Sequence, residues 1–129
     1  QILDTTPTLP DLGYYEFAKI LVDSPDISAV VVSPVPETHM MASVTGDLGK
    51  LCGRDYMLEE ETKSFPKLMK KLAGETRKPL IMTIECGWKF ASLRQYLLDA
   101  GLVVFERSDR AARALSNVCR GFVGWAGPK

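Results

Sequence analysis

Three short apolar runs decide the fold, and the first of them is Ile27-Ser28-Ala29-Val30-Val31-Val32-Ser33. This run is rich in β-branched residues and apolar throughout rather than alternating, which is typical of a strand buried on both faces. The other two runs are Pro79-Leu80-Ile81-Met82-Thr83-Ile84 and Leu102-Val103-Val104-Phe105. Turn residues bound each run, so we expect three buried strands.

Segments with helical periodicity separate these strands. Asp11 precedes apolar residues spaced three and four apart, and we predict that it caps a first helix ending at Ser24-Pro25-Asp26. Pro66 is tolerated only in a first helical turn, which places another helix start at residues 62–64. The expected helices cover residues 11–23, 62–74, 87–100 and 108–122, with a short helix and an irregular loop between Glu37 and Leu58.

Alternation of strands and helices predicts the fold class. It implies β–α–β crossovers, and therefore a three-layer α/β/α fold with a mostly parallel sheet. We expect one domain over residues 1–123 and a tail or linker over residues 124–129, where Gly and Pro are frequent. Because Ile2-Leu3 is apolar and no Met precedes it, we also expect a chain cut within or at the edge of a fold, with Ile2-Leu3 as an additional short strand.

Composition narrows the range of partners. The 129 residues carry 16 basic and 16 acidic side chains, so no strong field attracts nucleic acid or an anionic membrane. The longest apolar runs are too short to span a bilayer. The three cysteines are odd in number and widely spaced, which predicts reduced thiols in a cytoplasmic protein rather than disulfides or a zinc site.

Candidate ligand residues lie where the strands of such a sheet end. Ser33 ends the first strand, and Glu37-Thr38 follows it at a position where free helix amides can face an anion. Asp4-Thr5-Thr6 forms a hydroxyl-rich turn, either a phosphate cradle or a plain polar turn. Glu85 and Trp88 lie at the end of the second strand, in a ligand-facing turn or an ordinary capped turn.

Several kinds of chemistry lack their motifs. The sequence contains no GxGxxG, GxxxxGK[ST] or GxSxG, so we place no ATP site, catalytic residue or metal site in this chain. His39 is the only histidine, and its role stays open between an acid–base or phosphorylated residue and a loop residue. A flavin-binding flavodoxin is a weak alternative, because the turn after Asp4 contains no Gly.

Five pieces of sequence, in order, resemble the ADP-forming acetyl-CoA synthetases and their succinyl-CoA ligase relatives. The start is similar to the family's Asn-Pro-x-Asp-x-Thr/Gly stretch, and the others to its Ala-Val-Val-Val strand, its Lys-Pro-Val strand, its Ala-Gly-Ile-Pro-Val-Tyr segment and its closing Ser-x-Asp-Arg-Ala segment. The matching residues are Ile2-Leu3-Asp4-Thr5-Thr6-Pro7, Ser24 to Ser33, Lys78-Pro79-Leu80-Ile81, Ala100 to Phe105 and Ser108 to Leu115.

The resemblance implies a flavodoxin-like domain equivalent to the C-terminal part of the succinyl-CoA ligase β subunit, truncated at its first strand. It implies an accessory role in an acid–thiol ligase that uses CoA, ATP and Mg²⁺, none of them bound by this chain alone. The CoA-binding and ATP-grasp domains would be its partners. The family's phosphohistidine context is not matched at His39, and Pro34, Pro36 and Glu37 stand where relatives carry a Gly-Gly pair. The alternative function is a non-catalytic interaction or small-ligand-binding module.

Overall fold

The computed structural model contains helices and strands in the predicted alternating order. It describes residues 4–5, 8–36, 38, 40–41, 64–85 and 87–124, with side chains described up to residue 121. Helices α1 and α3 flank strand β1, and α4 and α5 follow β2 and β3. The elements are α1 (Asp11–Asp23), β1 (Val30–Val32), α3 (Phe65–Glu75), β2 (Leu80–Thr83), the 3₁₀ turn η1 (Trp88–Phe90), α4 (Ala91–Asp99), β3 (Val103–Phe105) and α5 (Ser108–Gly124).

The three strands form one open, all-parallel sheet in the order β1-β2-β3. Val30 aligns with Leu80, and Ile81 aligns with Val103. The ladder extends beyond β2, because the N–H of Ile84 donates to the carbonyl oxygen of Phe105 at 2.9 Å. The prediction of an α/β fold with a parallel sheet is therefore confirmed.

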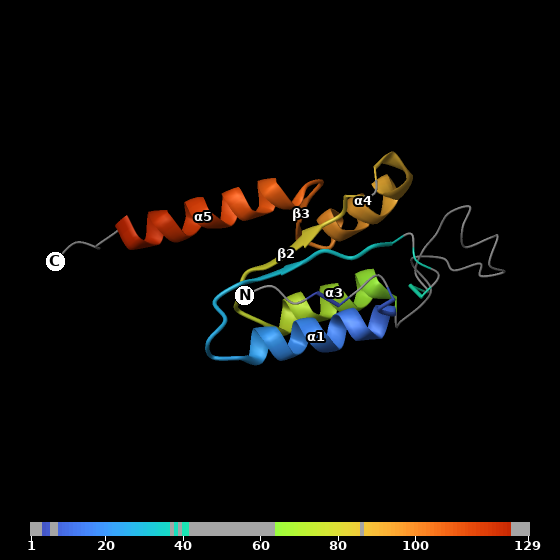
Figure 1. The fold of residues 1–129 in the computed structure, drawn as a ribbon, viewed down its shortest axis with the longest axis horizontal. Coiled ribbons are helices and arrows are strands. Elements are labelled where there is room, and N and C mark those ends of the chain that lie inside the picture. Colours follow the sequence, from blue (N-terminus) through green and yellow to red (C-terminus); the bar gives the residue numbers. More distant parts are fainter. Residues whose placement is uncertain are drawn as a thin grey trace.

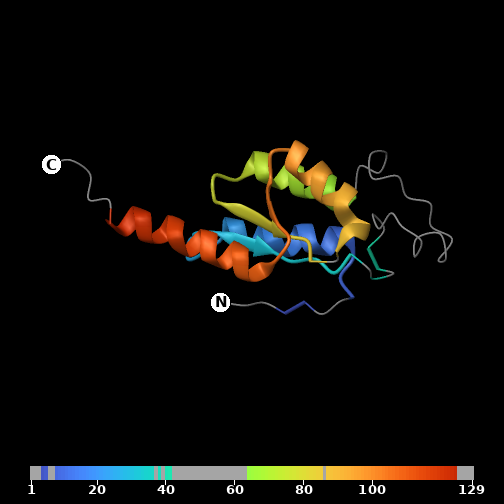
Figure 2. The same ribbon diagram turned by 90° about the horizontal axis from the view of Figure 1, so that it is seen from above.

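The helices cover the two faces of the sheet unequally. Side chains of α1, α3 and α4 share one core with β1 and β2. Helix α5 lies on the other side of the strands from α1 and α3 in Figure 1, and from α3 and α4 in Figure 2. Only the first turns of α5 contact β2 and β3, and Figures 1 and 2 both show its second half extending past the sheet. One face is thus packed by three helices and the other by the start of one.

This imbalance corrects one expectation from the sequence. All four residues of β2 are buried, as predicted, but Val31 in β1 is 41% exposed and Val103 in β3 is 52% exposed. Both side chains belong to outer strands of a three-stranded sheet, where α5 covers only part of the second face. The continuous apolar runs therefore predicted parallel strands correctly, but the prediction that both faces of each strand are buried was correct only for β2.

The helices expected over residues 62–74 and 87–100 end at Gly74 and just before Gly101, and only Gly101 ends its helix in the structure. Gly101 has φ +83° directly after α4, and its N–H donates to the carbonyl oxygen of Leu98 at 2.9 Å. This left-handed residue follows the last residue of the expected helix and ends it. Gly74 lies inside α3, which continues to Glu75, so the expected end at residue 74 was one residue too early.

A buried carboxylate joins α1 to α3. Asp11 is the first residue of α1, and its Oδ1 accepts a hydrogen bond of 2.7 Å from the N–H of Phe65, the first residue of α3. Both residues are buried, with Asp11 only 4% exposed. Asp11 was predicted to cap its own helix, but its side chain supplies the acceptor that the start of α3 requires.

Candidate functional site

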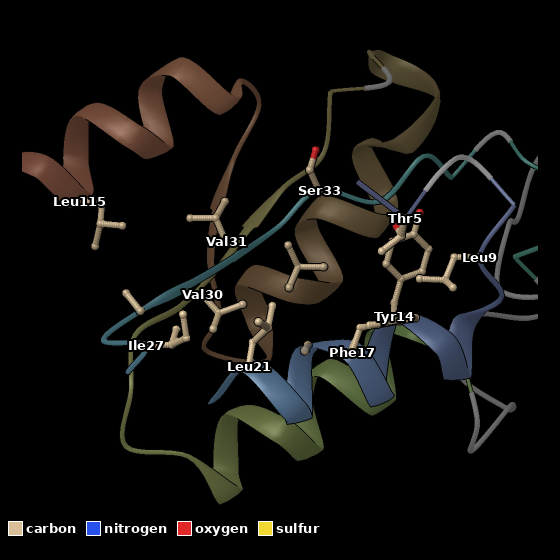
Figure 3. A pocket seen from close by; sticks show the side chains of 13 residues that line it. Thr5, Leu9, Tyr14, Phe17, Leu21, Ile27, Val30, Val31, Ser33 and Leu115 are labelled. Carbon is tan, nitrogen blue, oxygen red and sulfur yellow. The ribbon is translucent and has the colours of Figure 1, made fainter. Parts of the chain in front are cut away.

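The predicted ligand residues fall into two groups. Ser33 is exposed directly after β1, and Thr5 is half-buried; both line the same cavity (Figure 3). Asp4 is exposed beside Thr5, and Thr38 is half-buried, five residues after Ser33. Thr6, Glu37 and His39 lie outside the described residues, as do Ile2-Leu3 and the expected helix and loop between Glu37 and Leu58, apart from single residues there.

Helix α1 fixes the segment that follows β1. The N–H of Val35 donates to the hydroxyl oxygen of Tyr14 at 3.3 Å, while Pro34 and Pro36 on either side are buried. Tyr14 is itself held by an edge-on contact with the Phe65 ring, 5.6 Å between centroids. The backbone segment at this carboxyl end of the sheet is therefore anchored to α1, and we call it the clamped segment (residues 34–36). The Val35 N–H, the amide donor between the two prolines, is already hydrogen-bonded.

Thr38 closes the turn after this segment. Its N–H donates to the carbonyl oxygen of Val35 at 3.3 Å, and the N–H of Met41 donates to the carbonyl oxygen of Thr38 at 3.3 Å. The Thr38 hydroxyl is buried and has no hydrogen-bond partner among the described residues. The turn is thus held mainly through its backbone.

The start of α5 carries an anion supplied by the chain itself. Glu85, just after β2, accepts a hydrogen bond of 2.7 Å from the N–H of Ser108 and a second bond from the Ser108 hydroxyl. Free amides at a helix start favour a negative charge, and here the carboxylate occupies that position. The sequence placed the start of this helix at Ser108, and the side chain that bonds its first amide is Glu85, 23 residues earlier.

The turn between β2 and α4 presents an exposed indole. Trp88 is 82% exposed and begins η1, directly after Gly87, whose φ is +68°. Arg94 holds this turn from α4, because its Nη1 donates to the Gly87 carbonyl oxygen at 2.7 Å, and its Nε lies 3.5 Å from a carboxylate oxygen of Glu106. The indole is therefore exposed on a turn whose backbone is held by the Arg94 side chain.

The cavity beside β1 is the feature that sequence reasoning missed. It has a volume of about 610 Å³ and is lined by 13 residues from α1, β1, α5 and the N-terminal segment, all of them uncharged (Figure 3). Phe17 and Leu21 of α1 lie below β1 and Leu115 of α5 lies on the other side of it. The sequence signal that could have indicated this cavity is the apolar face of α1, because not all of its apolar side chains are buried in the core. Phe17, for example, is 40% exposed.

Two exposed side chains have pKa values shifted mainly by a hydrogen bond to a single nearby residue. In the first turn of α5, a hydrogen bond of 2.8 Å from Arg107 holds the pKa of Asp109 below its usual value of 3.8. On α1, the hydrogen bond to Asp23 raises the pKa of Lys19 above 10.5.

Within the ranges that the structure describes, no cluster of three or more His, Cys, Asp and Glu side chains is arranged to hold a metal ion. No helix there is long and apolar enough to cross a bilayer.

The described residues do not assemble a phosphate site at this edge. Pro34 and Pro36 have no N–H to donate, the Val35 N–H is bonded to Tyr14, and Glu85 fills the start of α5. A bound phosphate would meet the Glu85 carboxylate where it needs amide donors. The nucleotide and Mg²⁺ that the resemblance implies would therefore require residues beyond those described.

The chain was compared with protein-family models, with curated proteins and with solved structures, and none of the three comparisons found a match.

Proposed function

We propose that the chain is an accessory domain of an acid–thiol ligase of the NDP-forming acyl-CoA synthetase type and is inactive alone. The observation that carries this proposal is the carboxyl edge of the all-parallel sheet, where Ser33 and Thr5 line one cavity beside a clamped backbone segment. Ligands of open parallel sheets bind outside this edge. The ordered sequence resemblance, from Ile2 to Leu115, supports the same function.

The edge is suited to positioning a neighbouring group rather than to binding a nucleotide itself. The hydrogen bond to Tyr14 and the burial of Pro34 and Pro36 anchor the segment after β1 on α1 and the core. The exposed hydroxyl of Ser33, next to this anchored segment, can help to orient a phosphorylated side chain brought by another domain. The chemistry of acyl-phosphate formation, CoA attack and ATP binding would belong to the CoA-binding and ATP-grasp partners.

Thioester formation tests this function. The 129-residue chain and the full product of its gene are each incubated with ATP, Mg²⁺, CoA and a panel of short carboxylic acids. We expect thioester only from the full product, with a lower rate for Ser33→Ala and an unchanged rate for Ser28→Ala, two residues before β1. A full product that lacks ATP-grasp and CoA-binding domains and also finds no such subunit would contradict the proposal, as would thioester formed by the chain alone.

A second function, a non-catalytic interaction module, is favoured by two observations. The Glu85 carboxylate already accepts the first amide of α5, where an anionic ligand would otherwise bind. Most of the residues that line the cavity beside β1 are apolar. Both features suit binding of a polypeptide better than binding of phosphate. Calorimetric titration of the chain with inorganic phosphate, ATP and CoA tests this, because a micromolar site for any of them would count against it.

A further inference from the structure

The outer edge of β1 carries main-chain groups that pair with no strand among the described residues. The inner edge of β1 pairs with β2 through bonds such as that from the Val30 N–H to the Pro79 carbonyl oxygen, 2.9 Å. In a parallel strand, successive residues direct their N–H and C=O groups to opposite edges. Ala29, Val31 and Ser33 therefore direct theirs outward, toward the cavity beside β1.

The chain's own N-terminal segment lies at one end of this cavity. Leu9 packs against the core and onto the first turn of α1, where a Cβ on Gly13 would lie 2.8 Å from the Leu9 Cγ and Cδ1. Glycine permits this close approach. Thr5, four residues earlier, lines the cavity at the end where Ser33 and Tyr14 also lie (Figure 3). The segment before α1 therefore passes the carboxyl end of β1.

The arrangement of the helices determines where a strand that precedes α1 belongs. Strands β1, β2 and β3 are neighbours in sequence order, and their connecting helices α3 and α4 share one core with α1. When crossovers keep the right-handed sense and their helices lie on one face, consecutive strands advance across the sheet in one direction. A strand connected to β1 through α1 in the same sense lies parallel to β1, on the side away from β2.

The two walls of the cavity match the alternation of the first residues of the chain. Phe17 and Leu21 of α1 stand on one side of β1, and Leu115 of α5 stands on the other (Figure 3). Ile2 and Leu3 are consecutive apolar residues, so in a strand their side chains point to opposite faces. One of them thus meets each apolar wall.

Length and register agree with this placement. Four residue steps back from Thr5 span about 13 Å at roughly 3.3 Å per residue, the same as the steps across residues 29–33, which line the cavity consecutively. With Thr5 level with Ser33, Leu3 is level with Val31, whose side chain is 41% exposed on the α5 face. Ile2 then lies on the opposite face, where α1 supplies the wall.

A tethered segment has an advantage over any segment from outside the chain. Leu3 is two residues from Thr5, which already lines the cavity, so its effective concentration there is on the order of millimolar or higher. An outside strand, or the same residues of a second copy, must displace this segment to pair with β1.

We propose that residues 1–5 form a strand parallel to β1 at its outer edge, with Ile2 and Leu3 filling the cavity from its two sides. The cavity then belongs to the chain itself rather than to an external polypeptide. The strand also sets the Thr5 hydroxyl beside the Ser33 hydroxyl at the carboxyl edge of the sheet, which gives two donors in place of one. The strand stands on the cavity and the topology, whereas the use of this pair to orient a phosphorylated group rests on the proposed function.

Disulfide trapping tests the placement in a chain whose native cysteines are replaced by Ser. Leu3→Cys is combined with Val31→Cys or, as the matched control, with Val103→Cys. Val31 and Val103 align with the same residue of β2, Ile81, so they lie in one row of the sheet two strands apart, and both are exposed. Strands are spaced by about 4.8 Å and a disulfide needs Cα atoms within about 7 Å. We expect at least about tenfold more intramolecular disulfide with Val31→Cys.

Hydrogen exchange followed by NMR tests the same placement in the unaltered chain. The outward N–H of Val31 should be protected, and deletion of residues 1–3 should speed its exchange at least about fivefold, because its acceptor is lost. The Val30 N–H, bonded to Pro79 on the inner edge, is the internal control and should change by less than about twofold.

Three outcomes overturn the inference. Leu3→Cys links to both partners equally, or the disulfide joins two chains, which makes a second copy the source of the strand, or the Val31 N–H of the unaltered chain exchanges as fast as an unbonded amide. The last outcome needs no variant, so it stays decisive if the cysteine variants do not fold. Thr5→Val in the full product should lower the thioester rate as Ser33→Ala does. An unchanged rate beside a formed Leu3–Val31 disulfide would contradict the ligase role and leave the strand in place.

Discussion

Replacement of Asp11 by Ala should destabilise the protein through the junction of α1 and α3. The Asp11 carboxylate accepts the N–H of Phe65 at 2.7 Å, in a site where Asp11 is 4% exposed and Phe65 is fully buried. Alanine leaves this donor without its acceptor in a place that water reaches poorly. The carboxylate links residues that are 54 positions apart, so its loss affects the packing of two helices.

The expected magnitude follows from two overlapping effects. Loss of a helix cap costs about 1 kcal/mol, and a buried donor left unbonded costs roughly 1–3 kcal/mol. Because both describe the same amide, we expect about 2 kcal/mol in all rather than their sum. For a chain of this size, that free energy lowers Tm by roughly 6–10 °C. Asp11→Asn keeps an oxygen acceptor and should lose about half as much.

Urea unfolding followed by circular dichroism measures these differences. Asp23→Ala is the matched control, because Asp23 ends the same helix in an exposed pair with Lys19, 2.8 Å apart, and should cost less than about 0.5 kcal/mol. The reasoning is refuted if Asp11→Ala costs no more than Asp23→Ala. It is also refuted if Asp11→Asn is as destabilising as Asp11→Ala, since the acceptor oxygen would then be irrelevant.

Three other predictions concern helix ends. Glu85→Ala removes the acceptor at the start of α5 and should cost about 1 kcal/mol in urea unfolding, and a variant as stable as the parent would contradict the capping role. Since the hydrogen bond from Arg107 lowers the pKa of Asp109, the stability it provides is present above the unfolded pKa and is lost as pH falls through the folded value. Arg107→Gln should therefore raise the pKa of Asp109 toward 3.8 in an NMR titration, and an unchanged value would exclude Arg107 as the cause. Gly101→Ala should destabilise the protein by about 1 kcal/mol because φ is +83°, whereas Gly74→Ala inside α3 should stabilise it by roughly 0.5–1 kcal/mol. Apart from the adjacent backbone, no described atom lies within 4 Å of either added Cβ, so equal effects would refute the backbone argument.

Local sequence patterns predicted the elements well. The apolar runs around Val31, Ile81 and Val104 became parallel strands, and Pro66 marked the first turn of α3. These features depend on side-chain shape and backbone preference over a few residues, which the sequence states directly. Gly101 was predictable for the same reason, since glycine readily adopts the left-handed conformation after a helix.

The candidate site was predicted less completely. The sequence identified Ser33 and Thr5 separately, and their common cavity appears only when α1 places the N-terminal segment beside β1. The partner of Ser108 is Glu85, 23 residues away, and the partner of Val35 is the Tyr14 hydroxyl, 21 residues away. No local pattern reports such pairs, because they depend on where the sheet brings separate chain segments.

The sequence by itself determined the alternation of strands and helices, the parallel sheet and the balanced charge. Only the tertiary structure decided which faces are covered: Val31 and Val103 lie in runs as apolar as the buried Ile81, yet they lie on outer strands. Hydrophobic pattern depends on residues a few positions apart, whereas burial depends on how many elements reach each face. With three helices on one face and the start of α5 on the other, the open edge of β1 is a property of assembly rather than of any segment.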